Sequence, residues 1–166
     1  ALSARAGLTK SYVSLLEAGK KVPAISTLSD IAAALGTTLG ELFENFEETS
    51  AVAVVKRDER FQVAKKGTPF GYVYEALSTH NRNRTMVPFI VTVLPRSAKK
   101  RKFVEFQHAG EEFDFVLEGR IQYTIDDQDY VLEAGDSIYF DSSLRHRVEA
   151  LDGQPAVTLS VHVEKS

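Results

Sequence analysis

The spacing of hydrophobic residues changes from a helical period to a strand period part-way along the chain. In residues 1–46, apolar side chains recur every three or four positions, as in amphipathic helices. From Phe61 onward, short runs rich in β-branched and aromatic residues alternate with turn residues. The pattern therefore predicts two modules in line. Between them, at residues 47–60, we expect an acidic and polar linker with a β-arm formed by the β-type run at 51–55.

The first module, residues 1–46, is predicted to be helical. Residues 2–9 have the pattern of a helix end, a turn at Gly7 and the start of the next helix, because glycine readily adopts the positive φ of a tight turn. Thr9 is a suitable N-cap, and Gly19 and Gly36 are suitable ends. The three helices expected after the turn are Thr9 to Gly19, Ser26 or Thr27 to Gly36, and Leu39 to Phe46.

The second module, residues 61–166, is predicted to be all-β. Its candidate strands are Gly71–Leu77, Met86–Leu94, Lys102–Phe106, Phe113–Glu118, Arg120–Ile125, Gln128–Glu133, Ser137–Phe140, His146–Ala150 and Ala156–Val163. Many short strands with turn residues at regular intervals indicate a sandwich or barrel, and the lack of helical pattern between them argues against a parallel sheet. The predicted fold class is therefore α+β.

Composition and charge indicate the cellular compartment of the protein and exclude some classes of partner. The chain has 166 residues, no cysteine and a formal net charge of −3, with 43% hydrophobic residues. A disulfide framework is excluded, and no apolar run approaches the roughly 20 residues of a membrane span. The start of the chain is charged and does not resemble a signal peptide. We expect a cytoplasmic protein with no membrane partner. The helical module is itself neutral, so DNA binding by a single copy would be weak.

The helical module resembles a known class of DNA-binding regulators. The resemblance runs from Leu2 to Lys20 and continues through Pro23, Leu28, Ile31, Ala32, Ala34, Leu35 and Gly36. It is to the phage-repressor or xenobiotic-response-element type of helix-turn-helix protein. In that class another helix precedes the first segment, so the resemblance implies that the leading helix is absent from this sequence.

The resemblance implies that residues 9–18 form the recognition helix, whose N-terminal residues enter the major groove of DNA. Lysine can donate to guanine acceptors, and serine can contact either base type. Leu15 stands where a polar base reader is common and could contact only a thymine methyl group. The candidate DNA-binding residues are Thr9, Lys10, Ser11, Tyr12, Ser14 and Lys20.

Two stretches of the second module resemble the paired motifs of the cupin family, a double-stranded β-helix barrel. They are residues 108–119 and residues 135–146. The resemblance implies that His108, Glu112 and His146 are metal ligands, whereas the position of a further ligand histidine is occupied by Phe106. Two histidines and a carboxylate with open positions suit iron, and they also suit zinc that keeps a water. A barrel that holds no metal stays open as the alternative.

The order of the two modules is also that of the hydroxypropylphosphonate epoxidases, which are mononuclear iron enzymes. Residues 72–74, 87–89, 108–110 and 115–119 are similar to that group. The resemblance implies that Tyr72, Tyr74, Lys66 and Phe106 are candidate contacts for a bound small molecule. For the two tyrosines, packing of one strand face is the competing interpretation, and we favour it.

Together these features predict a DNA-binding transcriptional regulator whose barrel senses a small-molecule effector, with a metal such as iron or zinc as its cofactor. Because one helix-turn-helix unit covers few base pairs, we expect a homodimer or higher homo-oligomer on a double-stranded DNA operator. An iron-dependent oxidase or epoxidase is the alternative. We favour the regulator because the DNA-binding pattern is more complete than the catalytic one.

Overall fold

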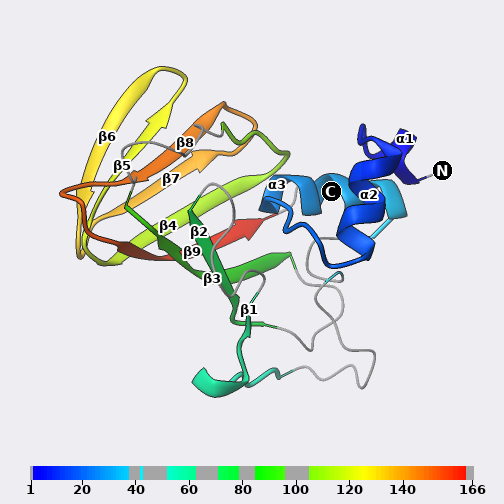
Figure 1. Ribbon diagram of the computed structural model, residues 1–166. Helices are drawn as coiled ribbons and strands as arrows, with labels where there is room; N and C mark the ends of the chain where they lie inside the picture. Colours follow the sequence, from blue (N-terminus) through cyan, green and yellow to red (C-terminus); the bar gives the residue numbers. More distant parts are fainter. Residues whose placement is uncertain are drawn as a thin grey trace.

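The computed structural model of the chain describes residues 2–37, 42, 52–62, 71–78, 85–95 and 105–163. Its helices are α1 (Leu2–Arg5), α2 (Lys10–Glu17) and α3 (Ile25–Leu35), followed by the short 3₁₀ helix η2 (Arg57–Glu59). In Figure 1 the three α-helices form one group at the side of a β-structure, with α3 next to the strands. Among the described residues, no helix combines the length and the apolar character needed to cross a membrane.

Local sequence explains where the helices begin and end. The turn before α2 has Gly7 at φ 64°, and the Thr9 hydroxyl caps α2 by accepting the backbone N–H of Tyr12 at 3.1 Å, so both predictions are confirmed. Helix α3 starts earlier than expected, at Ile25, with Ala24 as an N-cap that makes no side-chain hydrogen bond. Ala24 and Ile25 are buried, so packing rather than capping sets this start. Apart from Leu42, the expected helix at 39–46 lies outside the described residues.

The strands are β1 (Phe61–Gln62), β2 (Tyr72–Ala76), β3 (Met86–Val93), β4 (Glu111–Glu118), β5 (Arg120–Ile125), β6 (Gln128–Glu133), β7 (Ser137–Asp141), β8 (His146–Ala150) and β9 (Ala156–Val163). They form a six-stranded sheet in the order β1-β2-β3-β9-β4-β7 and a three-stranded sheet in the order β6-β5-β8. All pairings are antiparallel, and the two sheets curve around one interior (Figure 1). The α+β prediction, with helices followed by an all-β barrel, is confirmed.

Two predicted strands need correction. Residues 52–56 form no strand, and Val52 and Val54 are 71% and 72% exposed. A β-type sequence is stabilised by packing on a half-buried surface, which these two side chains lack. In the segment expected at 102–106, residues 102–104 lie outside the described residues. Phe106 forms only an isolated bridge with His146.

Strands β4 and β9 turn their polar side chains inward. On β4, Glu112 and Asp114 are buried, whereas Phe113 and Phe115 are exposed. On β9, the buried positions are Ala156, Thr158, Ser160 and His162, and the valines and leucine between them are only partly buried. Alternation usually places the apolar set in the core, so the reversal gives the barrel one polar inner wall.

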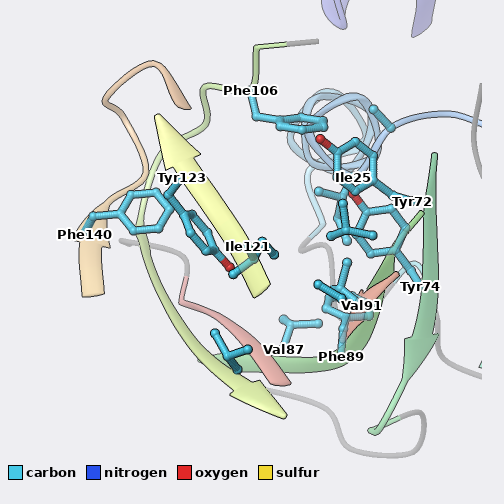
Figure 2. Packing of buried hydrophobic residues seen from close by; sticks show 14 of the residues in the cluster. Ile25, Tyr72, Tyr74, Val87, Phe89, Val91, Phe106, Ile121, Tyr123 and Phe140 are labelled. Carbon is cyan, nitrogen blue, oxygen red and sulfur yellow. The ribbon is translucent and has the colours of Figure 1, made fainter. Parts of the chain in front are cut away.

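The remaining interior is apolar and is shared with the helical module. The rings of Phe89 and Tyr123 are almost fully buried, as is Ile121, and Ala24 and Ile25 of α3 belong to the same cluster. Figure 2 shows Ile25 beside Tyr72 and below the Phe106 ring. The two modules therefore contact each other through side chains at the start of α3.

The turn between β4 and β5 depends on Gly119. Its φ is 82°, and a Cβ atom there would lie 2.6 Å from the carbonyl oxygen of Pro155 and 2.9 Å from Cα of Ala156. Only glycine fits both the backbone conformation and this close approach to the chain that enters β9.

Candidate metal centre

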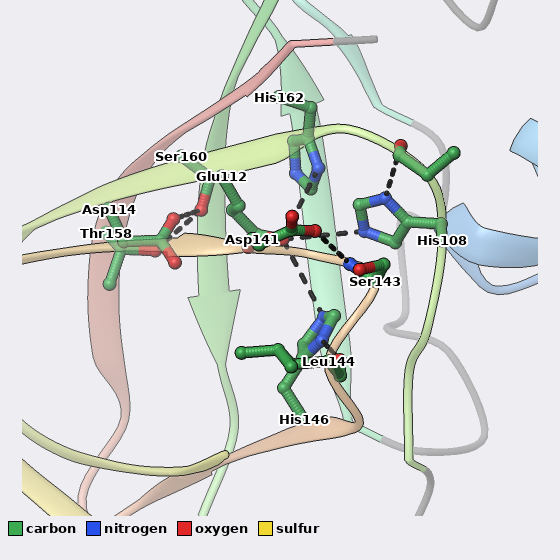
Figure 3. A network of polar contacts seen from close by, with 11 residues as sticks. His108, Glu112, Asp114, Asp141, Ser143, Leu144, His146, Thr158, Ser160 and His162 are labelled. Carbon is green, nitrogen blue, oxygen red and sulfur yellow. Dashed lines mark hydrogen bonds and ion pairs between the residues drawn. The ribbon is translucent and has the colours of Figure 1, made fainter. Parts of the chain in front are cut away.

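Three histidines surround the carboxylate of Glu112 inside the barrel (Figure 3). Oε2 of Glu112 lies 3.5 Å from Nε2 of His108, 3.7 Å from Nε2 of His146 and 3.5 Å from Nδ1 of His162. All four side chains are nearly or fully buried. The structure thus brings together the three ligands implied by the sequence and adds His162.

His108 and Glu112 are positioned by the entry into β4. The backbone N–H of His108 donates to the carbonyl of Ser142 at 2.9 Å, and Gly110 has φ 115° in the bend that follows. The chain therefore turns between the two residues, so strand alternation does not relate them. Glu112 is the second residue of β4 and points inward.

His146 is held in a defined orientation at the start of β8. Its backbone N–H donates to the carbonyl of Phe106 at 2.9 Å, and Phe106 returns the bond at 2.7 Å. Nδ1 of the ring lies 2.9 Å from the carbonyl of Leu144, which can only accept, so Nδ1 carries the proton. Nε2, the atom facing Glu112, is then the basic nitrogen that can bind a metal.

His162 is the site residue that the sequence motifs miss. It lies directly opposite Glu112 in the β4–β9 ladder, so the two side chains share the inner face. The available signal is alternation along β9, which places His162 on the same face as Thr158 and Ser160. The apolar residues between them would have suggested the opposite orientation.

Burial and mutual charge set the protonation of the four groups. Burial opposes ionisation of Glu112, but His162, His108 and His146 stabilise the carboxylate and lower its pKa to about 2. Burial lowers the pKa of His162 and of His146, which keeps both rings neutral. Burial also opposes charging of His108, but the close, negatively charged carboxylate of Glu112 raises its pKa. A carboxylate with neutral imidazoles is the form that binds cations.

The group fits a divalent cation. Nε2 of His108, Oε2 of Glu112 and Nδ1 of His162 are buried and have no hydrogen-bond partner among the described residues, and the ligand atoms of these three residues lie within 4.8 Å of one another. Metal–ligand bonds of about 2.1 Å in a tetrahedral site separate the ligand atoms by about 3.4 Å. The gaps to Glu112 are therefore too long for good hydrogen bonds but match atoms that share one ion.

A polar row continues from Glu112 along the inner wall. The Ser160 hydroxyl donates to the Asp114 carboxyl group, and the Thr158 and Ser160 hydroxyls are 3.3 Å apart. Burial, reinforced by the charge of Glu112, raises the pKa of Asp114 well above its usual range. Asp114 is therefore a neutral acid that can donate as well as accept hydrogen bonds.

A pocket of about 400 Å³, part of it open to solvent, lies in front of this wall. Tyr72, Tyr74 and Phe106, the candidate small-molecule contacts, line it together with Ile25 of α3. The Tyr72 hydroxyl donates to the carbonyl of Val148 at 2.6 Å, which supports the packing interpretation of this residue. Lys66 lies outside the described residues.

The candidate DNA contacts lie on or beside α2. Thr9, Lys10, Ser11, Ser14 and Lys20 are exposed, and Tyr12 is half-buried. The ammonium group of Lys21 lies 5.0 Å from the centre of the Tyr12 ring, at cation–π distance. Leu15 is 36% exposed on the same helix.

Known proteins match both modules. Residues 1–42 match the helix-turn-helix family, and residues 90–162 match the cupin domain family. The HTH-type transcriptional regulator PuuR of Escherichia coli (strain K12) is 34% identical over 141 residues, which cover 84% of this chain and 72% of PuuR. The chain belongs to the helix-turn-helix–cupin family.

Other relatives of this helix-turn-helix–cupin protein include an enzyme. The (S)-2-hydroxypropylphosphonic acid epoxidase of Streptomyces wedmorensis is 30% identical over 168 residues, covering 96% of this chain and 84% of the epoxidase. A structure of that epoxidase aligns with a TM-score of 0.58 over 98% of this chain and 87% of its own. A transcriptional regulator from Vibrio cholerae, 19% identical, aligns with a TM-score of 0.63 over 100% of this chain and 86% of its own, so it shares the fold.

Proposed function

We propose that this helix-turn-helix–cupin protein is a DNA-binding transcriptional regulator that acts in the cytoplasm. Its barrel binds a small-molecule effector next to a divalent metal, iron or zinc. The observation that carries the proposal is the similarity to PuuR across both modules, at higher identity than to the epoxidase. The exposed polar face of α2 supports it.

The residues in and next to α2 have different roles in the proposed DNA binding. Lys10 and Ser11, exposed in its first turn, supply donors for base edges and phosphates. The Thr9 oxygen already accepts the N–H of Tyr12, so Thr9 orients the helix and can still donate its proton to a phosphate. Leu15 offers only an apolar contact, which limits sequence reading to the neighbouring polar positions.

The pocket suits an effector with an apolar part and a polar end. Tyr72, Tyr74 and Phe106 form the apolar side, and Asp114 and the β9 hydroxyls form the polar side. A cation held at Glu112, when bound, would provide a Lewis-acidic contact for a polar group of the effector. Because much of the pocket's volume is open to solvent, the enclosed part has room only for a small molecule or for one end of it.

Ile25 connects the pocket to the DNA-binding module. It lines the pocket at the start of α3, and α3 follows the recognition helix in the chain. An effector in the pocket therefore contacts the module that holds α2. Because binding energies at linked sites are reciprocal, the effector must change DNA affinity by the same factor by which DNA changes effector affinity.

The protein functions as a homodimer on a two-fold symmetric operator. Exposed apolar side chains on the outer face of the six-stranded sheet support self-association. Phe113, Phe115 and Leu117 of β4 are 36% to 42% exposed, and Tyr139 lies opposite Phe113 on β7. Such a face is usually covered by another subunit. Sedimentation of the full chain measures this directly, and a monomer at working concentration would contradict it.

Titration of the DNA upstream of its own gene with the full chain, at several salt concentrations, tests the regulator. Lys10→Ala should weaken binding and reduce the slope of log K against log salt by about 1, because one phosphate contact is lost. Arg57→Ala, an exposed basic residue of η2 outside the helical module, is the matched control and should leave the slope unchanged. Salt-independent or absent binding of the wild type would refute the proposal.

A second candidate function is iron-dependent oxidation of a small anionic substrate. It is favoured by the similarity to the epoxidase over 96% of this chain and by the buried group of His108, Glu112 and His146. Iron-loaded protein supplied with (S)-2-hydroxypropylphosphonic acid and either dioxygen or hydrogen peroxide tests it. Turnover that is lost in His108→Ala would establish the enzyme, whereas unchanged substrate would leave the regulator.

A further inference from the structure

We propose that His162 is a metal ligand, so that the barrel holds its cation with His108, His146, His162 and Glu112. This inference deepens the proposed function, because it rests on the metal site assigned there. It goes beyond the two sequence motifs, neither of which includes β9.

The position of His162 follows from the β4–β9 register. Glu112 and His162 are directly opposite in the ladder, and Asp114 and Ser160 form the next inward pair. His162 is 5% exposed. Its Nδ1, Nε2 of His108 and Oε2 of Glu112 are buried at this site and have no hydrogen-bond partner among the described residues. Three unsatisfied atoms from two strands and a loop thus converge on one point.

Packing alone explains why an aromatic ring stands at position 162, but it does not explain why that ring has a buried nitrogen facing Glu112. The ring meets Phe89 edge-on, with centroids 5.7 Å apart and planes at 81°, and a phenylalanine could make the same contact. An imidazole nitrogen 3.5 Å from a carboxylate oxygen instead loses its hydration without gaining a good hydrogen bond. A cation between the two atoms removes that cost.

Phe106 occupies the position from which the sequence motif would have supplied a further histidine, so the additional ligand must come from another strand, β9. Phe106 is packed between Tyr72, at 5.4 Å between ring centroids, and His146, at 5.9 Å. It contributes no ligand atom. The rings of His162 and His146 lie 5.4 Å and 5.5 Å from that of His108, so the three imidazoles form a ring around the carboxylate.

The full ligand set would also join the two sheets. Glu112 and His162 belong to the six-stranded sheet, whereas His146 begins β8 in the three-stranded sheet. A cation bound by all of them would stabilise the closed barrel by an amount that grows with the logarithm of its affinity. Four protein ligands leave fewer positions for substrate and oxygen than three do, which favours a sensor over an oxygenase.

The test uses the full chain stripped of metal and titrated with Zn²⁺ against a chromophoric chelator. His162→Phe keeps the ring and its contact with Phe89 but removes the ligand atom. Its Zn²⁺ affinity should fall about 100-fold or more, since loss of even an outer-shell partner costs about 10–100-fold. Val161→Thr, a change at the outward-facing position next to His162 on β9, is the matched control and should bind Zn²⁺ as the wild type does.

X-ray absorption of the Zn²⁺-loaded proteins counts the imidazole ligands. We expect three in the wild type and two in His162→Phe. The count in the wild type does not require any variant to fold, so it decides the question even if His162→Phe is unstable by circular dichroism. Two imidazoles in the wild type would overturn the inference.

His108→Ala separates this inference from the proposed metal site. If the wild type binds Zn²⁺ in a manner that depends on His108, but His162→Phe binds it equally tightly, only the role of His162 is wrong. If the wild type binds no Zn²⁺, the metal site of the proposed function fails and His162 as a ligand fails with it. DNA binding is tested separately, by the DNA titration described above, and its result does not depend on the metal experiments.

Discussion

Replacing Tyr72 with phenylalanine removes one oxygen atom from the seam between the two sheets of the barrel. Tyr72 lies on β2 of the six-stranded sheet, and its hydroxyl donates to the carbonyl of Val148 on β8, the outer strand of the other sheet, at 2.6 Å. The variant keeps the aromatic contacts with Phe106 and Tyr74. The change therefore removes the hydrogen bond to Val148 and leaves these ring contacts in place.

The expected loss follows from the surroundings of that bond. Tyr72 is 6% exposed, so the Val148 carbonyl would lose its phenol partner in a site where water has little access. Leaving a buried acceptor unsatisfied costs about 1–3 kcal/mol, and we expect about 1.5 kcal/mol for this partly buried pair. For a chain of this size each kcal/mol lowers Tm by about 2–4 °C, which predicts a decrease of about 3–6 °C.

Thermal and urea unfolding followed by circular dichroism measure the effect. Tyr130→Phe is the matched control, because Tyr130 is 39% exposed on β6 and its replacement should leave Tm unchanged. A Tyr72→Phe protein as stable as the wild type would refute the reasoning that this bond closes the barrel.

Two further predictions concern stability. Gly119→Ala should lower the free energy of unfolding, measured in urea, by about 2–4 kcal/mol. The alanine Cβ would clash with the Pro155 carbonyl, and alanine would also be strained at a φ of 82°. A loss below about 1 kcal/mol would contradict the close approach. Stability should also fall as the pH rises above about 10, where phenols ionise in the unfolded chain. Burial holds the pKa values of Tyr72, Tyr74 and Tyr123 above that value in the folded protein, so unfolding releases protons there. Urea unfolding at pH 8 and at increasing alkaline pH measures this fall, and Tyr72→Phe should flatten it; a pH-independent stability would show that the phenols are accessible to water.

Local features of the sequence predicted most of the elements, and the resemblance to the cupin motifs predicted most of the candidate site. Strands such as Arg120–Ile125, Gln128–Glu133 and Ala156–Val163 have the predicted bounds, because strong turn residues flank them. Thr9 caps α2 as expected, since a cap depends on residues three positions apart. The set of His108, Glu112 and His146 followed from the resemblance to the cupin motifs, and the structure brings these three side chains together.

Contacts between side chains on different strands were decided only by the tertiary structure. His162 reaches Glu112 through a register between strands about 50 residues apart, and no local pattern sets that register. The sequence of β4 and β9 does not identify their inner face, because hydrophobic alternation cannot tell a core from an exposed apolar face. Likewise, Ile25 lies just before the expected start of its helix, and only the packing of the two modules shows that it lines the pocket. The sequence determined which side chains could act, and the packing of the two modules decided which of them meet.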